Sequence, residues 1–364
     1  MNFDELIIYY FSGTGNALNV ARWINNITEE KNIKTTLVNL AESNRKKPVI
    51  PKENSLVGFI SQTHGFNFPP LMLHFILRFP KAKNCKAFIM NTRGGLKFGK
   101  IFFPGLSGIT QLFSSLVLLL KGFKIIGMRP VDLPSNWISL HPGLKDSAIT
   151  SIYEKRKEEV IEFADKILDG KRDLKALKDI IQDLLISPVS VLYYLFGRFM
   201  FAKSFIASGD CNNCGLCKKE CPVNAIKSID GRPYWTHKCE SCMHCMNICP
   251  KRAIETAHGF IIAMAVFINP VPLFYIYSFF NFHELSEQFP FIFSDTMLFL
   301  FDSVVFIGFL ILSYRIIHFL LRFKVFEILV VYSSLTKYKF WRRYNFGINQ
   351  KKLISVRSNI CKLL

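Results

Sequence analysis

A doubled cysteine motif constrains this sequence more than any other feature. The two copies are Cys211-x2-Cys214-x2-Cys217-x3-Cys221-Pro222 and Cys239-x2-Cys242-x2-Cys245-x3-Cys249-Pro250. Three cysteines at two-residue intervals let a tight loop wrap three corners of a cubane, and the fourth ligates the other cluster. The spacing therefore predicts two 4Fe-4S clusters held crosswise. Cluster 1 takes Cys211, Cys214, Cys217 and Cys249, and cluster 2 takes Cys239, Cys242, Cys245 and Cys221.

Structural zinc is the alternative for such a group of cysteines, because paired C-x2-C motifs also bind zinc. Zinc requires neither a third cysteine step nor a trailing proline, and it does not require the same pattern twice. The acidic start of the chain, without a signal-peptide pattern, predicts a reducing cytoplasm rather than a secreted disulfide scaffold. The repeated spacing thus favours iron–sulfur clusters over zinc and over disulfides.

The segment from residue 211 to residue 256 resembles bacterial-type two-cluster ferredoxins. Besides the cysteines, the two motifs are followed by matching turns, CPVNAI and CPKRAI. The resemblance implies that each cluster carries one electron at low potential.

Residues 1–170 alternate between strand-like and helix-like stretches. Apolar runs at 6–11, 35–40, 56–61, 87–90 and 124–127 are expected strands, with helices near 15–30, 70–78, 106–121 and 152–168. This βα alternation predicts a doubly wound α/β fold with a parallel sheet and helices on both faces.

A glycine-rich loop follows the first expected strand and opens the first helix. Backbone N–H groups at a helix N-terminus attract a phosphate, and glycines let the loop close around it. No lysine follows as in a Walker A loop, and Leu18 stands where a dinucleotide-binding fold needs its third glycine, so neither nucleotide class is favoured. The candidate phosphate-binding residues are Ser12, Gly13, Thr14, Gly15, Asn16 and Ala17.

This loop resembles the FMN-phosphate loop of flavodoxins, which implies a flavodoxin-like domain that binds FMN. Ala17 departs from that pattern, because a hydroxyl side chain is usual there. In such folds the flavin ring lies beyond the carboxyl ends of the strands. The loops after the third and fourth strands are therefore expected to flank it, the alternative being ordinary loop residues. They supply Thr63, His64, Gly65, Phe66, Asn91, Thr92 and Gly94.

Residues 1–256 together resemble a family of prokaryotic flavodoxin–ferredoxin fusion proteins. Leu133-Pro134-Ser135-Asn136-Trp137 and Gly231-Arg232-Pro233-Tyr234-Trp235 add to that resemblance. It implies generic electron transfer and names no substrate.

Apolar stretches after the cysteines predict a membrane hairpin at 258–314, with spans at about 259–280 and 292–314. The expected order is a flavodoxin-like domain at 1–170, an amphipathic linker at 171–207, a ferredoxin domain at 208–257, the hairpin, and a basic tail at 315–364. Arg198 and Lys203 argue against a span in the linker, which is expected to pack on the protein or lie at the membrane surface.

Charge asymmetry orients the hairpin. Lys251 and Arg252 precede it, Arg315 and Arg322 follow, and no Lys or Arg lies in the connecting loop. By the positive-inside rule the redox domains face the cytoplasm at the cell membrane. The net charge of +19 favours anionic lipid or an acidic partner over nucleic acid, for which no binding motif is present.

These features predict an electron relay between FMN and two clusters, with a redox partner protein or a quinone as donor or acceptor. One alternative is a flavin-dependent reductase fed by the clusters. Another is a membrane assembly or sensor module whose flavodoxin fold is empty.

Overall fold

A computed structural model describes residues 3–43, 48, 50–268, 270–279 and 295–341. Their contacts divide them into two compact units. Unit 1 contains residues 3–194 together with 242–247, and unit 2 contains residues 195–241 together with 248–341.

Unit 1 is built on a parallel sheet with the strand order β2-β1-β3-β4-β6. A short antiparallel strand, β5, pairs with the end of β4. When the five parallel strands are numbered among themselves, with β6 as the fifth, their order is 2-1-3-4-5. This is the order of a flavodoxin-like doubly wound sheet, so the predicted fold class is confirmed. The strands are β1 (Leu6–Phe11), β2 (Thr35–Asn39), β3 (Leu56–Gln62), β4 (Lys86–Phe98), β5 (Ile101–Phe103) and β6 (Lys124–Pro134).

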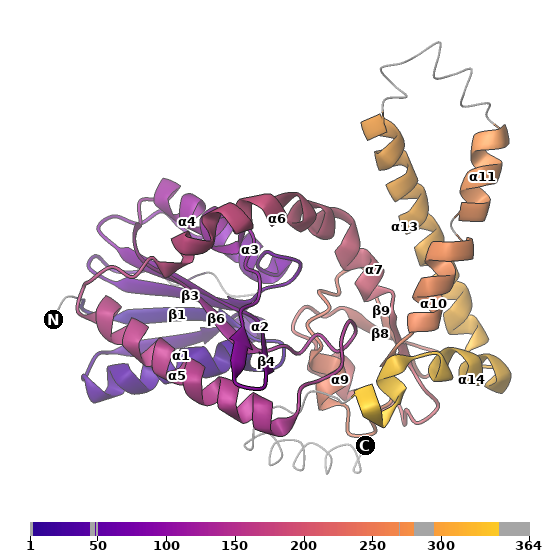
Figure 1. The fold of residues 1–364 in the computed structure, drawn as a ribbon, viewed down its shortest axis with the longest axis horizontal. Helices are drawn as coiled ribbons and strands as arrows, with labels where there is room; N and C mark the ends of the chain where they lie inside the picture. Colours follow the sequence, from indigo (N-terminus) through magenta and orange to yellow (C-terminus); the bar gives the residue numbers. More distant parts are fainter. Residues whose placement is uncertain (1–2, 44–47, 49, 269, 280–294, 342–364) are drawn as a thin grey trace. The chain divides into compact units, whose positions relative to one another are not determined.

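Helices cover both faces of this sheet (Figure 1). Alternate residues of β1 serve the two faces, with Leu6 and Ile8 in one core and Ile7 and Tyr9 in the other. The first core is closed by α1 and α5, and the second by α3 and α4. Because both faces are covered, the central strand β1 is apolar throughout. The helices of unit 1 up to this point are α1 (Asn16–Glu30), α2 (Leu40–Ser43), α3 (Pro70–Arg78), α4 (Thr110–Leu120) and α5 (Asp146–Leu168).

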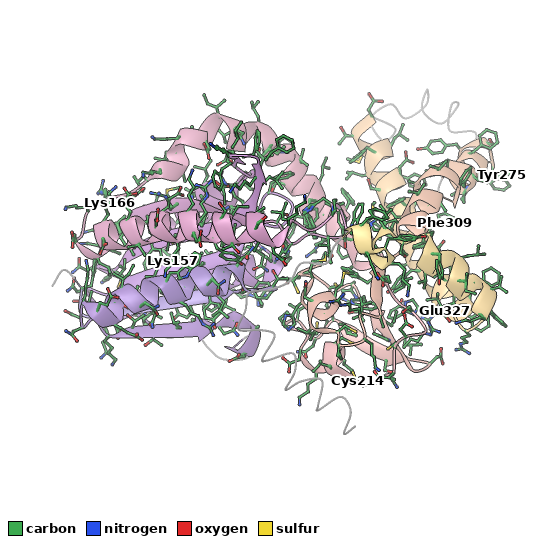
Figure 2. The ribbon with its side chains drawn as sticks, turned by 60° about the horizontal axis from the view of Figure 1, so that its bottom comes forward. Lys157, Lys166, Cys214, Tyr275, Phe309 and Glu327 are labelled. Atoms are coloured by element: carbon green, nitrogen blue, oxygen red, sulfur yellow. The ribbon has the colours of Figure 1, made fainter. Side chains whose placement is uncertain are left out.

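The expected strands and helices all form, but β4 and β6 run well past their predicted ends at 90 and 127. Their additional residues are mixed polar and glycine positions, which hydrophobic patterning alone does not mark as strand. This extension carries Thr92 and Gly94 beyond the body of the sheet. On the outer side, α5 exposes charged side chains such as Lys157 (Figure 2).

Most of the expected linker forms a continuous helical segment, 175–202. It contains η1 (Lys175–Asp179), α6 (Ile180–Leu192), η2 (Tyr193–Gly197) and α7 (Arg198–Ala202). At 28 residues it is long and apolar enough to cross a membrane by composition. Pro188 lies inside α6, and a π-helical turn follows it, as is common where the regular hydrogen-bond ladder is interrupted.

Unit 2 contains two short antiparallel sheets around the cysteine motifs. Strand β7 (Phe205–Ala207) pairs with β10 (Ile254–Thr256), and β8 (Ile226–Ile229) pairs with β9 (Arg232–Trp235). The ends of the segment are therefore paired with each other. Short helices α8 (Leu216–Lys219) and α9 (His244–Ile248) follow the two cysteine loops.

Two further segments could cross a membrane, 258–279 and 295–320. With 175–202 this makes three such helices among the described residues, where the sequence predicted two. The hydroxyl of Tyr277 donates to Asp302 Oδ1 at 2.7 Å, which joins the two segments. The predicted beginning of the second span, 292–294, lies outside the described residues. The elements are α10 (His258–Ala263), η3 (Met264–Ile268), α11 (Pro270–Phe279) and α13 (Asp295–Leu320).

Helix α13 extends past the predicted end of the span at 314, and its last turns pack on the cysteine segment. Tyr314 donates its hydroxyl to the Phe205 carbonyl at 2.7 Å. In α14 (Lys324–Tyr332), Glu327 accepts the Gly209 N–H at 2.6 Å. The part of the expected basic tail up to residue 341 is therefore folded against the segment, and 342–364 lies outside the described residues.

Candidate redox centres

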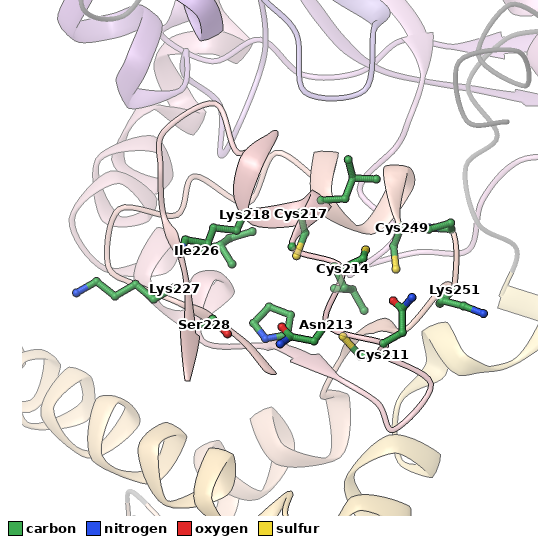
Figure 3. A pocket seen from close by; sticks show the side chains of 16 residues that line it. Cys211, Asn213, Cys214, Cys217, Lys218, Ile226, Lys227, Ser228, Cys249 and Lys251 are labelled. Carbon is green, nitrogen blue, oxygen red and sulfur yellow. The ribbon is translucent and has the colours of Figure 1, made fainter. Parts of the chain in front are cut away.

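Four cysteines from both motifs line one cavity in unit 2 (Figure 3). Cys211, Cys214 and Cys217 come from the first loop, and Cys249 joins them from the end of the second motif. Leu216, Ile226 and Ile254 also line the cavity. The four cysteines are the set that the spacing predicts for cluster 1. The fold thus brings the fourth cysteine of the second motif to the three cysteines of the first loop.

The fourth cysteine of each motif has the same hydrogen-bonded environment. The Ala225 N–H donates to Cys221 Sγ at 3.2 Å, and the Ala253 N–H donates to Cys249 Sγ at 3.4 Å. Each donor lies four residues after its cysteine. Backbone N–H groups aimed at sulfur stabilise the charge of ligating thiolates and help to set cluster potentials.

The backbone repeats between the motifs as well. Three positions in each motif adopt the left-handed conformation: two residues after the first cysteine, one after the second, and three after the fourth. These residues are Asn213, Gly215 and Asn224 in one motif and Ser241, Met243 and Arg252 in the other. Such a conformation costs free energy for residues other than glycine, and it concentrates at sites where a ligand is held. The two cysteine loops therefore have the same backbone conformation at equivalent positions, as expected if both hold the same kind of ligand.

Burial makes these thiols poor anions in the absence of a metal. Burial, with smaller contributions from the charges of Cys249 and Cys211, raises the pKa of the Cys217 thiol to about 12. Burial also raises the pKa of the Cys239 thiol to about 12, with a smaller contribution from Cys221. Buried thiolates need a cationic partner, and iron supplies it.

Within the described residues, no group of three or more His, Cys, Asp or Glu side chains is close enough to hold a single metal ion. A cubane has four iron corners, so its ligands stand further apart than the ligands of one ion. Cys211, Cys217 and Cys249 are free thiols at this cavity, and the chemistry of their sulfurs fits such a cluster.

The cysteines of the second predicted ligand set are divided between the two units. Cys221 and Cys239 belong to unit 2, and the charge of Cys221 contributes to the raised pKa of Cys239. Cys242 and Cys245 belong to unit 1 by their contacts. Their ligation of cluster 2 remains the prediction of the spacing.

A buried lysine lies beside Cys239. Lys203 is 4 % exposed and donates from Nζ to the Trp235 carbonyl at 2.6 Å. Its ammonium lies 4.8 Å from the Tyr234 ring centroid and 4.7 Å from that of Tyr314. Burial lowers the pKa of Lys203 to about 8, and the Cys239 thiolate acts in the opposite direction. Sequence patterning did not single out this residue, because a lone lysine in an aromatic stretch has no diagnostic spacing.

Unit 1 has a second cavity of about 280 Å³ beyond the carboxyl ends of its strands. It brings together residues predicted from the loops after β3 and β4, together with Asn16. The predicted residues that line it are Asn16, Thr63, His64, Gly65, Phe66, Thr92 and Gly94. Loops that are distant in sequence thus converge at the switch point of the sheet, where α/β folds bind ligands.

The phosphate-binding loop leads directly into α1. Gly15 adopts the left-handed conformation with φ 99° before the helix, and no side chain caps the helix N-terminus. Ser12 Oγ is buried and has no hydrogen-bond partner among the described residues. Asn16 donates to the Pro134 carbonyl at 3.0 Å and accepts from the Tyr153 hydroxyl at 2.5 Å. An unpartnered hydroxyl beside uncapped N–H groups fits a phosphate.

The amide of Gln62 fits a polar ligand edge. Its Nε2 and Oε1 are buried without a partner among the described residues, and the residue lines the cavity. Nearby, the His64 and Trp137 rings stack with centroids 5.7 Å apart and planes 8° apart. A flat aromatic ligand matches this combination of ring faces and an amide.

The loop after β6 is the part of the cavity that sequence reasoning did not assign. Ser135, Asn136, Trp137 and His141 all line the cavity, and Ser135 Oγ lies 2.6 Å from His141 Nε2. The available signal was positional, because this loop also follows the carboxyl end of a parallel strand.

Some predicted residues lie elsewhere. Asn91 is fully buried and does not line the cavity. Its Nδ2 donates to Thr63 Oγ1 at 2.7 Å and to Ser107 Oγ at 3.1 Å, so it holds the cavity loops in place. Ser12, Gly13, Thr14, Gly15 and Ala17 are likewise outside the cavity lining, in the loop before α1 and its first turn.

A buried ion pair includes Arg93, which also lines the cavity. Arg93 Nε donates to Asp132 Oδ1 at 2.6 Å, and Arg93 Nη1 reaches Asp179 Oδ2 at 2.9 Å. Arg93 and Asp132 are 8 % and 7 % exposed. The Asp132 carboxylate also accepts the Gly105 N–H at 2.8 Å, which fixes another cavity loop.

Comparison with known families gives one match, a 4Fe-4S dicluster domain at residues 210–254. This match and the cavity of four cysteines identify unit 2 as carrying a 4Fe-4S ferredoxin-type domain. A search of curated proteins found no match. With the flavodoxin-like sheet, the chain is an electron-transfer module of the flavodoxin and ferredoxin type.

Solved structures with some likeness to the chain include the following three proteins. Rubredoxin oxygen:oxidoreductase from Desulfovibrio gigas is 15 % identical, with 44 % of this chain and 35 % of that one covered and a TM-score of 0.30. Flavodoxin 1 from Bacillus cereus is 14 % identical, with 43 % and 97 % covered and a TM-score of 0.28. General stress protein 14 from Treponema denticola, solved in complex with FMN, is 11 % identical, with 44 % and 98 % covered and a TM-score of 0.30. The fold assignment rests on the strand order and not on these scores.

Proposed function

We propose that this chain is a membrane-anchored electron-transfer protein that relays electrons between FMN in unit 1 and two 4Fe-4S clusters. The observation that carries the proposal is the convergence of Cys211, Cys214, Cys217 and Cys249 on one cavity. Bound FMN exchanges two electrons and can release them singly, while each cluster carries one. The protein would thereby connect two-electron and one-electron partners.

The residues around the clusters have separable tasks. The cysteines supply thiolates, and the N–H groups of Ala225 and Ala253 stabilise the charge on two of the sulfurs. Lys203 places a buried positive charge beside Cys239, which favours the more negative, reduced state of a cluster held there. The apolar cavity lining keeps water from the ligands.

The residues of the unit 1 cavity fit the parts of FMN. The N–H groups at the start of α1 and the Ser12 hydroxyl would bind the phosphate. His64 and Trp137 would lie against the ring system, and the Gln62 amide would bond its polar edge. The predicted Thr63, Gly65, Phe66, Thr92 and Gly94 shape the rest of the cavity.

The membrane part of the proposal rests on the helices at 258–279 and 295–320. With Lys251 and Arg252 before the first and Arg322 after the second, the positive-inside rule favours redox units on the cytoplasmic side. The partner is proposed to be a redox protein or a quinone that meets the chain at the membrane.

Anaerobic purification in detergent, followed by iron, sulfide and flavin analysis, tests the proposal. We expect about eight irons, about eight acid-labile sulfides and about one FMN for each chain. Stoichiometric zinc without sulfide would refute the clusters. Two clusters without flavin, after incubation with excess FMN, would favour the assembly or sensor function instead. Turnover of a small-molecule acceptor that stops when FMN is removed would favour the reductase.

A further inference from the structure

Helix α6 has its apolar side outside and its polar side inside. Ile181, Leu184 and Leu185 are 73 %, 56 % and 77 % exposed, whereas Asp183 and Ser190 are 1 % and 0 % exposed. A helix at the surface of a water-soluble domain shows the reverse arrangement, with an apolar stripe facing the core.

The exposed residues form one continuous stripe. Ile181, Leu184, Leu185, Val189 and Leu192 follow the spacing i, i+3, i+4, i+8 and i+11, which keeps them on one face over three turns. Asp183 and Ser190 are seven residues apart and lie on the opposite face. An apolar surface of this length is unfavourable in water and marks a contact with lipid or protein.

Basic side chains next to the apolar stripe favour an anionic lipid surface over a protein as its partner. The residues leading into α6 include four exposed basic side chains, Lys171, Arg172, Lys175 and Lys178. Lys171 pairs with Asp169 at 3.6 Å and Lys175 pairs with Glu162 at 3.7 Å, and both pairs are exposed to solvent, where they contribute little. Basic residues beside an apolar helix face attract anionic headgroups, each by about 1 kcal/mol near the surface. The same chain also has two other helices that are long and apolar enough to enter a bilayer.

The polar face explains why the helix would lie on the membrane rather than cross it. Asp183 is 1 % exposed, and the Gly108 backbone acts on its carboxyl group, which places this side of α6 against the loop before α4 in unit 1. Ser190 is fully buried as well. A helix whose polar side is packed on a soluble unit cannot be surrounded by hydrocarbon.

We propose that α6 lies in the interfacial layer of an anionic leaflet, with its apolar stripe in lipid, and holds the flavodoxin-like unit on the bilayer. This inference rests on the membrane anchoring of the proposed function. It adds a second point of attachment, which restricts the unit that carries the flavin to the plane of the membrane.

Photo-crosslinking of the full chain tests this contact. A benzophenone amino acid replaces Leu185, and the protein is reconstituted in vesicles of phosphatidylcholine with phosphatidylglycerol or of phosphatidylcholine alone. The same residue at Lys157, exposed on α5, is the negative control (Figure 2). At Phe301, exposed on α13, it is the positive control for membrane insertion. We expect lipid adducts at 185 and 301, several-fold above those at 157.

The adducts separate the possible outcomes. Attachment at 185 to glycerol and upper acyl positions, increased by phosphatidylglycerol and reduced by salt, supports the inference. Lipid adducts at 301 without adducts at 185 overturn the inference and leave the anchoring intact. The absence of lipid adducts at both positions refutes the anchoring as well. Adducts from 185 to a second copy, to another segment of the chain, or to acyl chain ends also overturn it.

Discussion

The cysteine segment and the flavin cavity are assembled in opposite ways. In unit 2 the ligands of the first cluster come from two short motifs, and Cys249 is the only one of the four outside the first loop. In unit 1 the cavity is lined by residues from 16 to 141, spread over five loops. The ligands of the first site follow almost entirely from the cysteine spacing, whereas the second site depends on the sheet that aligns its loops.

The two sites therefore differ in how binding free energy is divided. Each cysteine of a cluster supplies one of four metal–thiolate bonds, so the removal of one ligand removes a quarter of the coordination. The phosphate and ring contacts proposed for FMN are many hydrogen bonds of about 1 kcal/mol each. A single ligand substitution in unit 2 should therefore eliminate a cluster, whereas a single substitution in unit 1 should weaken FMN binding by a limited amount.

Replacement of Cys249, the cluster 1 ligand that is most distant in sequence from the other three, should have the largest effect on iron content. In C249S we expect the loss of cluster 1, with about four of eight irons and the matching sulfides. The same cluster should be lost in C211S, because the two cysteines share one cavity. Iron analysis and low-temperature EPR of anaerobically purified protein measure both variants.

The matched control is C85S, which changes a buried thiol outside the motifs. It should retain all the iron. If C249S instead eliminated the signal that C239S eliminates, the crosswise assignment would be wrong.

The two sites also differ in how much of each can be predicted from the sequence. The spacing predicts the cluster ligands, since a pair of cubanes accounts for eight cysteines at these intervals and a zinc site does not require them. The alternation of apolar runs sufficed for the order of strands and helices. The extension of β4 and β6 was missed, because those residues are held by the neighbouring strand and not by their own hydrophobic pattern.

Residues that act through tertiary contacts could not be found in the same way. Trp137 lies in the cavity because β6 ends beside β4, and Lys203 is buried because β9 and α13 close over it. Neither position carries a local signature. Asn91 was expected in the loop after the fourth strand, but it lies inside β4. A single sequence does not show that its amide bonds Thr63 rather than a ligand.

A substitution of a buried residue in unit 1 should destabilise unit 1 and leave unit 2 unaffected. R93M leaves the Asp132 carboxylate buried with only the more distant Arg156, at 3.5 Å, and the Gly105 N–H. We expect a loss of about 3 kcal/mol in the unfolding free energy of unit 1. Flavin release on heating should occur at lower temperature, while the visible absorbance of the clusters is unchanged.

The control for this variant is R78M, which removes an exposed arginine from α3. It should shift flavin release by less than about 0.5 kcal/mol. An equal loss of clusters and flavin in R93M would show that the two units do not hold their cofactors independently.

A change in the phosphate loop should give a graded effect. In G15A a side chain is forced into a backbone with φ 99° at the start of α1. The strain of about 1–2 kcal/mol should weaken FMN binding by roughly tenfold. Fluorescence titration of flavin-depleted protein with FMN measures the change.

Gly99 provides the matched control, because it also has positive φ, at 57°, and a Cβ there meets no atom within 4 Å. G99A carries a similar backbone strain away from the cavity and should bind FMN normally. Equal weakening in both variants would mean that strain, and not the phosphate loop, limits binding.

The smallest predicted change concerns the cluster held by Cys239, where unit 2 in turn shows graded behaviour. K203M keeps the length of the side chain and removes a positive charge that is buried beside Cys239. A reduced cluster is more negative than an oxidised one, so the loss of the cation should lower the reduction potential. We expect at least about a tenfold change in the electron-transfer equilibrium constant, which is about 59 mV for one electron.

The comparison variant is K238M, which removes an exposed lysine adjacent to Cys239 in sequence. Water and salt screen that charge, so its removal should shift the potential much less. Potentiometric EPR titration of both variants resolves the two clusters, and only the one that is lost in C239S should respond to K203M. A larger shift in K238M would show that proximity in the chain matters more than burial. It would also remove Lys203 from the set of residues that tune the cluster.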